Sequence, residues 1–335
     1  MSKENIIVAK GLTKKFNKSL VAVDHIDFVV EEGEIFGFLG PNGAGKTTTI
    51  NMLITVLKPT EGNATVCHND IKKQSSEVRN CIGVVPQEYT ADEDLTGLEN
   101  ILLCADLYGI PKKLARERAN ELLELVELSK FKDKRVNTYS GGMRRRLELT
   151  CGLINRPKVL FLDEPTLGLD VQTRTATWGY IKRLKKEFKM TLFMTTHYLE
   201  EADNLCDRIA IIDRGKIVAL DTPNALKEGL GGDIITLATE QKDKDLTSLI
   251  EGAPRVKEVK RQDNTYRIKV ENGEETAPQI LNQLIEEGYR VTKLSLTKPT
   301  LDEVYLEYTG KSMRDEESSE DTFSKRITMR RARHG

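Results

Sequence analysis

Residues 40–47 read GPNGAGKT and follow the apolar run EIFGFL. They match the pattern G-x-x-x-x-G-K-[ST], whose glycines let backbone N–H groups turn toward a phosphate at a helix start. In this pattern Lys46 reaches the β- and γ-phosphates, the Thr47 hydroxyl is a ligand of Mg²⁺, and Thr48 is expected to donate to the α-phosphate. The predicted phosphate-binding residues are Gly40, Pro41, Asn42, Gly43, Ala44, Gly45, Lys46, Thr47 and Thr48.

Two carboxylates close a second apolar run, VLFLDE at residues 159–164. A buried strand would not tolerate them in its interior, so Asp163 and Glu164 mark its end. We expect Asp163 to hold the Mg²⁺ shell and Glu164 to orient and deprotonate an attacking water. The alternative is an acidic pair that faces solvent, and the combination with a phosphate loop argues against it.

Two more apolar runs end in polar side chains. His197 ends TLFMTTH, where it could contact the γ-phosphate and fix the geometry of attack, although a lone histidine at a strand end is more often structural. Gln87 ends VVPQ and could reach Mg²⁺ or water, which is a weak signal by itself.

A second phosphate-binding helix start is predicted at residues 139–143, YSGGM. Ser140 has the type of an N-cap residue, and Gly141 and Gly142 leave backbone N–H groups bare at the start of a strongly helical run. The chain therefore has two such helix starts but one evident nucleotide pocket.

Length and composition limit the class of protein. The 335 residues suit one large and one small domain, and 51 Lys+Arg against 52 Asp+Glu argue against nucleic-acid binding. The run Arg144, Arg145 and Arg146 does not change this, because consecutive helical residues point in three directions. No apolar stretch is long enough to span a bilayer, and no secretory signal is evident. The five cysteines form no C-x-x-C pair and are interpreted as small apolar residues in a reduced compartment.

The elements that must position these residues form two predicted domains. Residues 1–229 alternate apolar strands with helices, which is typical of an α/β domain around a parallel sheet, with a helical insertion at about 90–155. Gly231 and Gly232 mark a joint. Residues 230–310 follow the order βαββαβ, which predicts a small ferredoxin-like α+β domain closed by a helix. Residues 311–335 form a charged tail, for which we predict disorder.

The order and spacing of these motifs resemble the ABC-type ATPase cassette over about residues 6–229. YSGGM stands where that family usually has LSGGQ and keeps the central Ser-Gly-Gly. The resemblance implies a P-loop NTPase fold that binds ATP and Mg²⁺. It makes Glu164, His197 and Gln87 catalytic, with Thr47, Gln87 and Asp163 near the metal. It also places Phe16 where the family usually has a tyrosine that stacks on adenine, and Asp170 of TLGLD in the family's loop at the dimer seam.

The resemblance also resolves the question of two helix starts and one pocket. In such ATPases two copies stack head to tail, and the Ser-Gly-Gly turn of each copy caps the γ-phosphate held by the other. The implied partner is therefore a second copy of this chain, with two ATP molecules at a two-fold interface.

A narrower resemblance rests on YSGGMRRRLEL, on residues 92–109 and on KPTLDEVYLEYTG. These stretches look like the drug-resistance and sodium-extrusion branch of ABC exporter ATPases, including daunorubicin-resistance types. The branch implies a separate integral membrane permease, docked between Gln87 and the helical insertion, and a peripheral location on the cytoplasmic side of the membrane. The cargo it implies is a drug or other hydrophobic compound.

Other functions remain open at this point. A sodium, lipid or glycan exporter would share nearly this cassette. A soluble ABC ATPase of translation or DNA maintenance is less favoured, because neither a second cassette nor a long coiled-coil insertion is visible. A regulator without turnover is disfavoured by the presence of Glu164.

Overall fold

The computed structural model describes residues 4–16, 20–230, 232–240, 245–262 and 265–310. The chain divides into two compact units, Met1–Leu220 and Asp221–Gly335. The division lies before the boundary predicted after Gly229, because helix α8 (Pro223–Gly229) contacts helix α11 (Leu301–Thr309) of the second unit. The predicted disordered tail, 311–335, lies outside the described residues.

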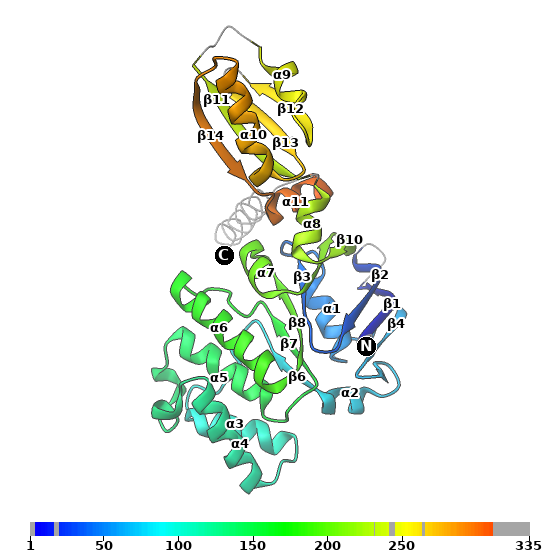
Figure 1. The fold of residues 1–335 in the computed structure, drawn as a ribbon. Helices are drawn as coiled ribbons and strands as arrows, with labels where there is room; N and C mark the ends of the chain where they lie inside the picture. The colour runs from blue at the N-terminus through cyan, green and yellow to red at the C-terminus, as the bar shows by residue number, and fades with distance from the viewer. Residues whose placement is uncertain (1–3, 17–19, 231, 241–244, 263–264, 311–335) are drawn as a thin grey trace, which may run out of the picture. The chain divides into compact units, whose positions relative to one another are not determined.

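A six-stranded sheet forms the centre of the first unit, in the order β10-β9-β3-β8-β7-β6 (Figure 1). Strands β9, β3, β8, β7 and β6 pair in parallel. Every residue of the three central strands is buried, as expected of parallel strands covered on both faces. The strands are β3 (Ile35–Leu39), β6 (Ile82–Val85), β7 (Val159–Asp163), β8 (Thr191–Thr196), β9 (Arg208–Asp213) and β10 (Lys216–Asp221).

Parallel pairing brings the carboxyl ends of β3, β8 and β7 to one edge of the sheet. The segment after β3 is the predicted phosphate loop, β7 ends in the acidic pair, and β8 ends just before His197. The sheet therefore brings together three segments that are far apart in the sequence, which is the usual place for a ligand site in an α/β fold.

An antiparallel sheet, in the order β2-β1-β4-β5, packs in the same unit. Its strands are β1 (Asn5–Lys15), β2 (Val21–Glu31), β4 (Glu61–Val66) and β5 (Asn69–Asp70). Helix α1 (Lys46–Leu53) contacts β2 and β4 as well as β7, so it lies between the two sheets. Aromatic rings pack where the two sheets meet. The ring centroids of Phe36, Phe38 and Phe193 lie 5.4–6.0 Å from the ring centroid of Phe28.

The predicted helical insertion consists of α3 (Gly97–Leu107), α4 (Lys112–Leu125) and α5 (Gly141–Leu153), joined by two short 3₁₀ turns. Thr96 starts α3 with a capping box, in which its hydroxyl accepts from the Glu99 N–H and the Glu99 carboxylate accepts from the Thr96 N–H. Helix α5 contacts both α3 and α4, and it also contacts β6, so it connects the insertion to the parallel sheet. Three other helices of this unit are α2 (Ser75–Cys81), α6 (Val171–Phe188) and α7 (Leu199–Leu205).

The second unit confirms the predicted βαββαβ order. Its elements are β11 (Asp233–Thr239), α9 (Thr247–Glu251), β12 (Val256–Gln262), β13 (Thr265–Val270), α10 (Gly273–Glu286) and β14 (Val291–Thr297). They form an antiparallel sheet in the order β12-β13-β11-β14. Alternate residues of β11 and β13 are buried with one face of α10, including Ile235, Ile268 and Ile280, so this unit has its own core.

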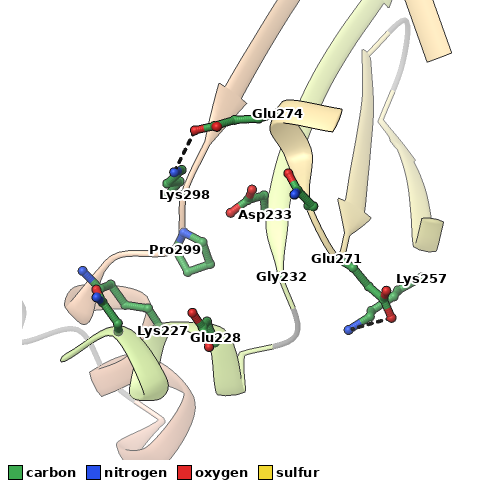
Figure 2. A pocket seen from close by; sticks show the side chains of 11 residues that line it. Lys227, Glu228, Gly232, Asp233, Lys257, Glu271, Glu274, Lys298 and Pro299 are labelled. Carbon is green, nitrogen blue, oxygen red and sulfur yellow. Dashed lines mark ion pairs between the residues drawn. The ribbon is translucent and has the colours of Figure 1, made fainter. Parts of the chain in front are cut away.

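A cavity of about 610 Å³ lies in the second unit beside α8 and the start of α10 (Figure 2). Charged side chains of both signs line it, and several pair with one another. Lys298 Nζ lies 2.9 Å from Glu274 Oε1, and Lys257 Nζ lies 3.8 Å from Glu271 Oε1. This balance gives the cavity no clear preference for a ligand of one charge.

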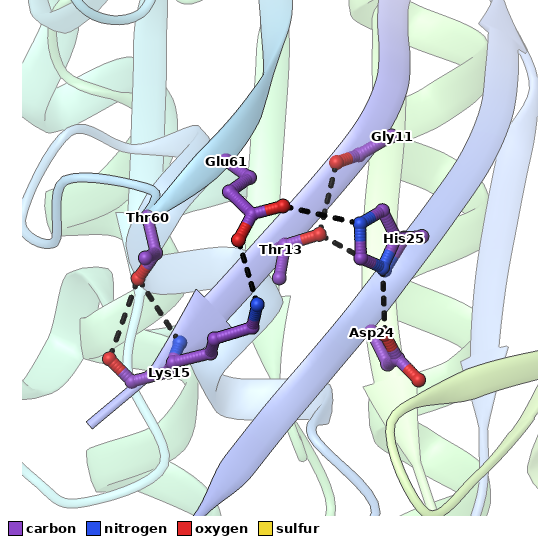
Figure 3. Close-up of polar contacts among 7 residues, drawn as sticks. All are labelled: Gly11, Thr13, Lys15, Asp24, His25, Thr60 and Glu61. Carbon is purple, nitrogen blue, oxygen red and sulfur yellow. Dashed lines mark hydrogen bonds and ion pairs between the residues drawn. The ribbon is translucent and has the colours of Figure 1, made fainter. Parts of the chain in front are cut away.

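His25 of β2 contacts Asp24 of its own strand, Glu61 of β4 and Thr13 of β1, so it joins three strands of the antiparallel sheet (Figure 3). The ring Nδ1 of His25 lies 2.7 Å from Asp24 Oδ1, and the ring Nε2 lies 3.2 Å from Glu61 Oε2. The backbone N–H of His25 donates to the Thr13 hydroxyl. The contact with Asp24 is the main cause that raises the pKa of His25, and Glu61 adds to it. Protonated His25 therefore stabilises this sheet.

We predict that His25→Asn lowers the melting temperature more at about pH 5.5 than at about pH 8.5. Asparagine tolerates the left-handed backbone at this position, where φ is 50°. Because the folded pKa is raised, the stabilisation is fully present below the unfolded pKa of about 6.5 and is lost as the pH rises through the folded value. Thermal unfolding at both pH values measures the difference, and His68→Asn, at another exposed histidine with a positive φ of 66°, is the control. Equal losses for His25→Asn at both pH values would contradict this assignment.

Candidate functional site

The predicted phosphate loop has the strand–loop–helix setting that its motif requires. It connects β3 to α1, and Gly45 stands at the N-cap of α1 with φ 107°. A Cβ on Gly45 would lie 2.4 Å from the Ala22 carbonyl oxygen, and one on Gly40 would lie 2.3 Å from the Ile212 carbonyl oxygen. Glycine is therefore required at both positions, because the backbone of neighbouring strands approaches the loop so closely.

Lys46 points into the loop and reaches the acidic strand end. Its Nζ donates to the carbonyl oxygens of Gly40 at 2.7 Å and Pro41 at 3.1 Å. The same Nζ lies 3.0 Å from Glu164 Oε1, and the two side chains are only 4% and 6% exposed. A buried ion pair thus connects the phosphate loop with the end of β7.

Asp163 lies beside the first turn of α1. Its Oδ1 accepts from the Thr47 hydroxyl at 3.2 Å and from the Thr195 hydroxyl of β8. Burial is the main cause that raises the pKa of Asp163, and the two hydroxyls oppose it. The structure therefore brings together Thr47 and Asp163, the two oxygen donors predicted for Mg²⁺.

Glu164 has a left-handed backbone, with φ 47°, which is rare for a residue with a long side chain. The Thr195 hydroxyl accepts from its N–H at 3.0 Å and supports this turn. His197 Nδ1 lies 2.7 Å from Glu164 Oε2. His197 is nearly buried too, so the predicted base and the predicted histidine form one compact group with Lys46.

The two neighbouring carboxylates differ in acidity. Burial acts to raise the pKa of Glu164, but the contact with His197 and the charge of Lys46 outweigh it and lower this pKa to about 2. Burial raises the pKa of Asp163, which has no ion pair with a cation among the described residues. The environment thus separates two acids that are adjacent in the sequence, which is typical of functional sites.

The second predicted helix start has the expected cap. Ser140 is the N-cap of α5, and its hydroxyl accepts from the Met143 N–H at 3.3 Å. A Cβ on Gly142 would lie 2.6 Å from Thr173 Cγ2, so Gly142 allows α5 to approach α6. Thr173 in turn donates from its N–H and its hydroxyl to Asp170, the N-cap of α6, at 2.9 and 2.6 Å.

This capped turn does not join the phosphate loop of its own chain. Within the part of the chain that the structure describes, no hydrogen bond or ion pair connects Ser140, Gly141 or Gly142 to residues 40–48. Tyr139, which replaces the family's usual leucine, is buried, and its hydroxyl donates to the Phe131 carbonyl oxygen at 2.8 Å. Its role is therefore to pack the base of the turn.

Gln87 and Phe16 lie apart from the buried group. Gln87 is exposed, and no hydrogen bond among the described residues joins its amide to Thr47, Asp163 or Glu164. Phe16 is 52% exposed, and Lys14 Nζ lies 5.3 Å from the centre of its ring. An exposed ring beside a cation is compatible with stacking on a base.

Sequence reasoning missed Thr195, which contacts both Asp163 and the backbone of Glu164. A hydroxyl in the apolar run LFMTTH was a visible signal, because a buried polar side chain needs a partner. It also missed Glu201, which is fully buried and accepts from the Thr166 hydroxyl at 2.8 Å and Trp178 Nε1 at 3.0 Å. Thr195 therefore supports the acidic pair, and Glu201 supports the segment that follows it.

Comparison with known proteins agrees with this geometry. Residues 23–167 match the family model of the ABC transporter, and residues 222–309 match the C-terminal domain of DrrA1-3-like ATP-binding proteins. The chain is 38% identical over 318 residues to the daunorubicin resistance ATP-binding protein DrrA2 of Streptomyces coeruleorubidus, covering 93% of this chain and 97% of that protein. This chain belongs to the family of ABC transporter ATP-binding proteins. The predicted resemblance to the drug-resistance branch is confirmed.

Two further relatives extend the comparison. The Nod factor export ATP-binding protein I of Ralstonia nicotianae is 35% identical over 311 residues, covering 92% of this chain and 95% of that protein. A dimeric structure of the ATP-binding cassette MJ0796 in a post-hydrolysis state, bound to ADP and Pi, aligns with a TM-score of 0.59 and 28% identity, covering 64% of this chain and 98% of that chain. The P-loop ATPase fold is therefore confirmed, and ATP hydrolysis coupled to transport is the activity expected of this family.

We predict that Thr195→Val lowers the ATP turnover number roughly tenfold, the scale of one lost hydrogen bond to a charged group. Valine keeps the shape and strand preference of the side chain but removes the hydroxyl that holds Asp163 and the Glu164 backbone. Steady-state ATPase assays on the purified chain measure the change. Thr191→Val is the matched control, because its hydroxyl lies at the other end of β8 and accepts from the Gly33 N–H at 2.9 Å. Native turnover in Thr195→Val would show that this hydroxyl does not position the acidic pair.

Proposed function

We propose that this chain is the ATP-hydrolysing subunit of an ABC exporter and that it powers a separate membrane permease by ATP-driven association of two copies. The observation that supports the proposal is the buried group in which Lys46 contacts Glu164 and Glu164 contacts His197, with Asp163 beside it in contact with the exposed Thr47. Each contact joins a different segment at the carboxyl edge of the parallel sheet.

The phosphate chain of ATP would bind along the loop. The N–H groups of residues 40–48 and the Lys46 ammonium offer donors for phosphate oxygens at the N-terminus of α1. Thr47 and Asp163 fit Mg²⁺, since a hydroxyl and a carboxylate already 3.2 Å apart are the oxygen donors that this ion prefers. Mg²⁺ held there would neutralise charge on the phosphates. Gln87 remains a candidate ligand, and Phe16 a candidate platform for adenine.

Glu164 is the proposed general base. With Lys46 and His197 in contact, its pKa of about 2 makes it a weak proton acceptor. When Lys46 turns from Glu164 to a phosphate, Glu164 loses one cationic neighbour and its pKa rises, so nucleotide binding itself prepares the base. His197 remains to orient the carboxylate toward the attacking water.

A second copy of the chain would complete the site. Gly142 lies against Thr173, which binds Asp170, and among the described residues no hydrogen bond or ion pair joins this group or Ser140 to the phosphate loop of its own chain. A head-to-tail pair would place the Ser140 turn of each copy over the γ-phosphate of the other, as two symmetric sites. Hydrolysis would then remove a phosphate that bridges the copies, and the pair could open.

The membrane partner and cargo follow from the relatives. Within the described residues, none of the helices combines the length and apolar character that a bilayer crossing needs. We propose a permease on another chain, a peripheral location at the cytoplasmic face of the membrane, and a drug or other hydrophobic compound as cargo. A sodium, lipid or glycan cargo is the second candidate, and one relative is named as a Nod factor export protein. The domain assignment stays a proposal as well: an ATPase cassette followed by an accessory domain to about residue 310, with the predicted boundary near 229 moved to the division after Leu220.

We predict that Glu164→Gln binds ATP, fails to hydrolyse it and accumulates as a dimer. The amide keeps the shape of the carboxylate but cannot accept the proton, and loss of a general base lowers turnover by about 100-fold or more. Light scattering after size exclusion should show the mass rise from 37.8 kDa to twice that value when ATP and Mg²⁺ are added. Glu121→Gln, at an exposed ion pair with Arg156, is the control. Full turnover in Glu164→Gln, or undiminished specific activity in a wild-type sample diluted to monomers, would refute the proposal.

A further inference from the structure

Helix α5 carries two buried side chains of opposite charge one turn apart. Arg145 is 1% exposed and Glu148 is 2% exposed. Charged side chains are rarely buried unless hydrogen bonds compensate for the lost water. Neither residue belongs to the buried group around Lys46 and Glu164, so their burial needs another reason.

Arg145 binds backbone carbonyl groups just after β6. Its Nη1 donates to the Pro86 carbonyl oxygen at 2.8 Å, and its Nη2 donates to the Gln87 carbonyl oxygen at 2.9 Å. The guanidinium carbon also lies 5.2 Å from the centre of the Tyr89 ring. The two arms of one guanidinium therefore hold two successive carbonyl groups in a fixed geometry.

Glu148 binds backbone N–H groups three residues further along the same segment. Its Oε1 accepts from the N–H groups of Thr90 at 2.7 Å and Ala91 at 2.8 Å. Its Oε2 accepts from the Thr90 hydroxyl at 2.8 Å. The Glu148 carboxylate thus accepts hydrogen bonds and the Arg145 guanidinium donates them. All five hydrogen bonds are made with residues 86–91.

The neighbouring arginines of α5 face elsewhere. Arg144 contacts Glu93 at the surface, and Arg146 donates to the Val126 carbonyl oxygen at 3.0 Å and to the Tyr180 hydroxyl at 3.2 Å. This divergence agrees with the prediction that the three arginines form no stripe. The contacts of Arg145 are therefore specific to the segment that contains Gln87.

We propose that Arg145 and Glu148 are positioning residues that fix residues 86–91 to α5, so that Gln87 and the Ser140–Gly142 turn move as one body. The Tyr89 hydroxyl, which donates to the Gly141 carbonyl oxygen at 3.3 Å, extends the same connection to the turn itself. The inference rests on the proposed function, because it is there that Gln87 and this turn act on nucleotide. If the permease displaced residues 86–91, α5 would transmit the displacement to the Ser140–Gly142 turn. That turn would contact the γ-phosphate bound to the second copy.

Hydrogen exchange tests the connection without relying on activity. In the wild-type chain the Thr90 and Ala91 amides should be protected, because Glu148 accepts from both. Glu148→Gln should speed their exchange at least about tenfold while the amides in the core of α5 keep their protection. In a Glu164→Gln background, ATP should slow exchange in residues 86–91 and 140–143 together, and Glu148→Gln should leave a change in only one of the two segments.

Kinetics tests the consequence for the reaction. Arg145→Lys keeps the positive charge but cannot hold two carbonyl groups at fixed angles. We expect it and Glu148→Gln to lower the ATP turnover number roughly tenfold with less than about a twofold change in KM, because residues 40–48 are untouched. Arg156→Gln, which breaks the surface ion pair with Glu121 of α4, is the matched control. It should leave both the turnover number and KM unchanged.

The outcomes separate this inference from the proposed function. Native turnover in both variants, or Thr90 and Ala91 amides that exchange as in wild type, would overturn the positioning role alone. A higher KM together with a lower turnover number and a lower melting temperature would mean that the pair merely stabilises the fold. That result would also overturn the positioning role. A wild-type chain without ATP turnover would instead refute the proposed function.

Discussion

The organisation of the site depends on the ion pair between Lys46 and Glu164. Lys46 begins α1 after the loop that follows β3, and Glu164 follows the end of β7. Strands β3 and β7 are not neighbours in the sheet, since β8 lies between them. The pair spans the end of β8, and that strand supplies Thr195 and is followed by His197 to complete the group. Removing one member of such a buried pair costs about 3–5 kcal/mol, because the other charge is left uncompensated. The phosphate loop is therefore held in place by the same residue that is proposed to act as the base.

This arrangement makes the state of the base depend on the nucleotide. While Lys46 contacts Glu164, the carboxylate is ionised but strongly stabilised, and its pKa is about 2. An anionic phosphate competes for the same ammonium group, so the ligand and the base share one cation. Asp163 differs because burial raises its pKa, and a divalent cation would favour its charged form. The pKa of Glu164 thus depends on whether phosphate takes the Lys46 ammonium group, whereas the pKa of Asp163 depends on a divalent cation.

Local patterns predicted much of this structure. The loop at residues 40–47, the end of β7 and the cap at Ser140 depend on backbone geometry within a few residues, so the residue types reveal them. The order βαββαβ was likewise visible from periodicity. Contacts between distant segments were not: Thr195 on Asp163, Thr173 on Gly142 and the burial of Tyr139 arise from packing of separate elements. For the same reason α8 groups with the second unit, although its sequence continues the first.

Helix α5 shows how buried charge can encode position. Its N-terminal turn presents Ser140 and Gly142, and its next two turns bury Arg145 and Glu148 against the backbone of residues 86–91. Apolar side chains of similar size could fill the same space, but they would leave these carbonyl and N–H groups without their partners and would not select one register for a segment without regular structure. Hydrogen bonds of opposite polarity do select one, since only a single placement satisfies both the carbonyl and the N–H groups. We therefore interpret this pair as fixing geometry between two parts of the catalytic machinery rather than as adding to the stability of the core.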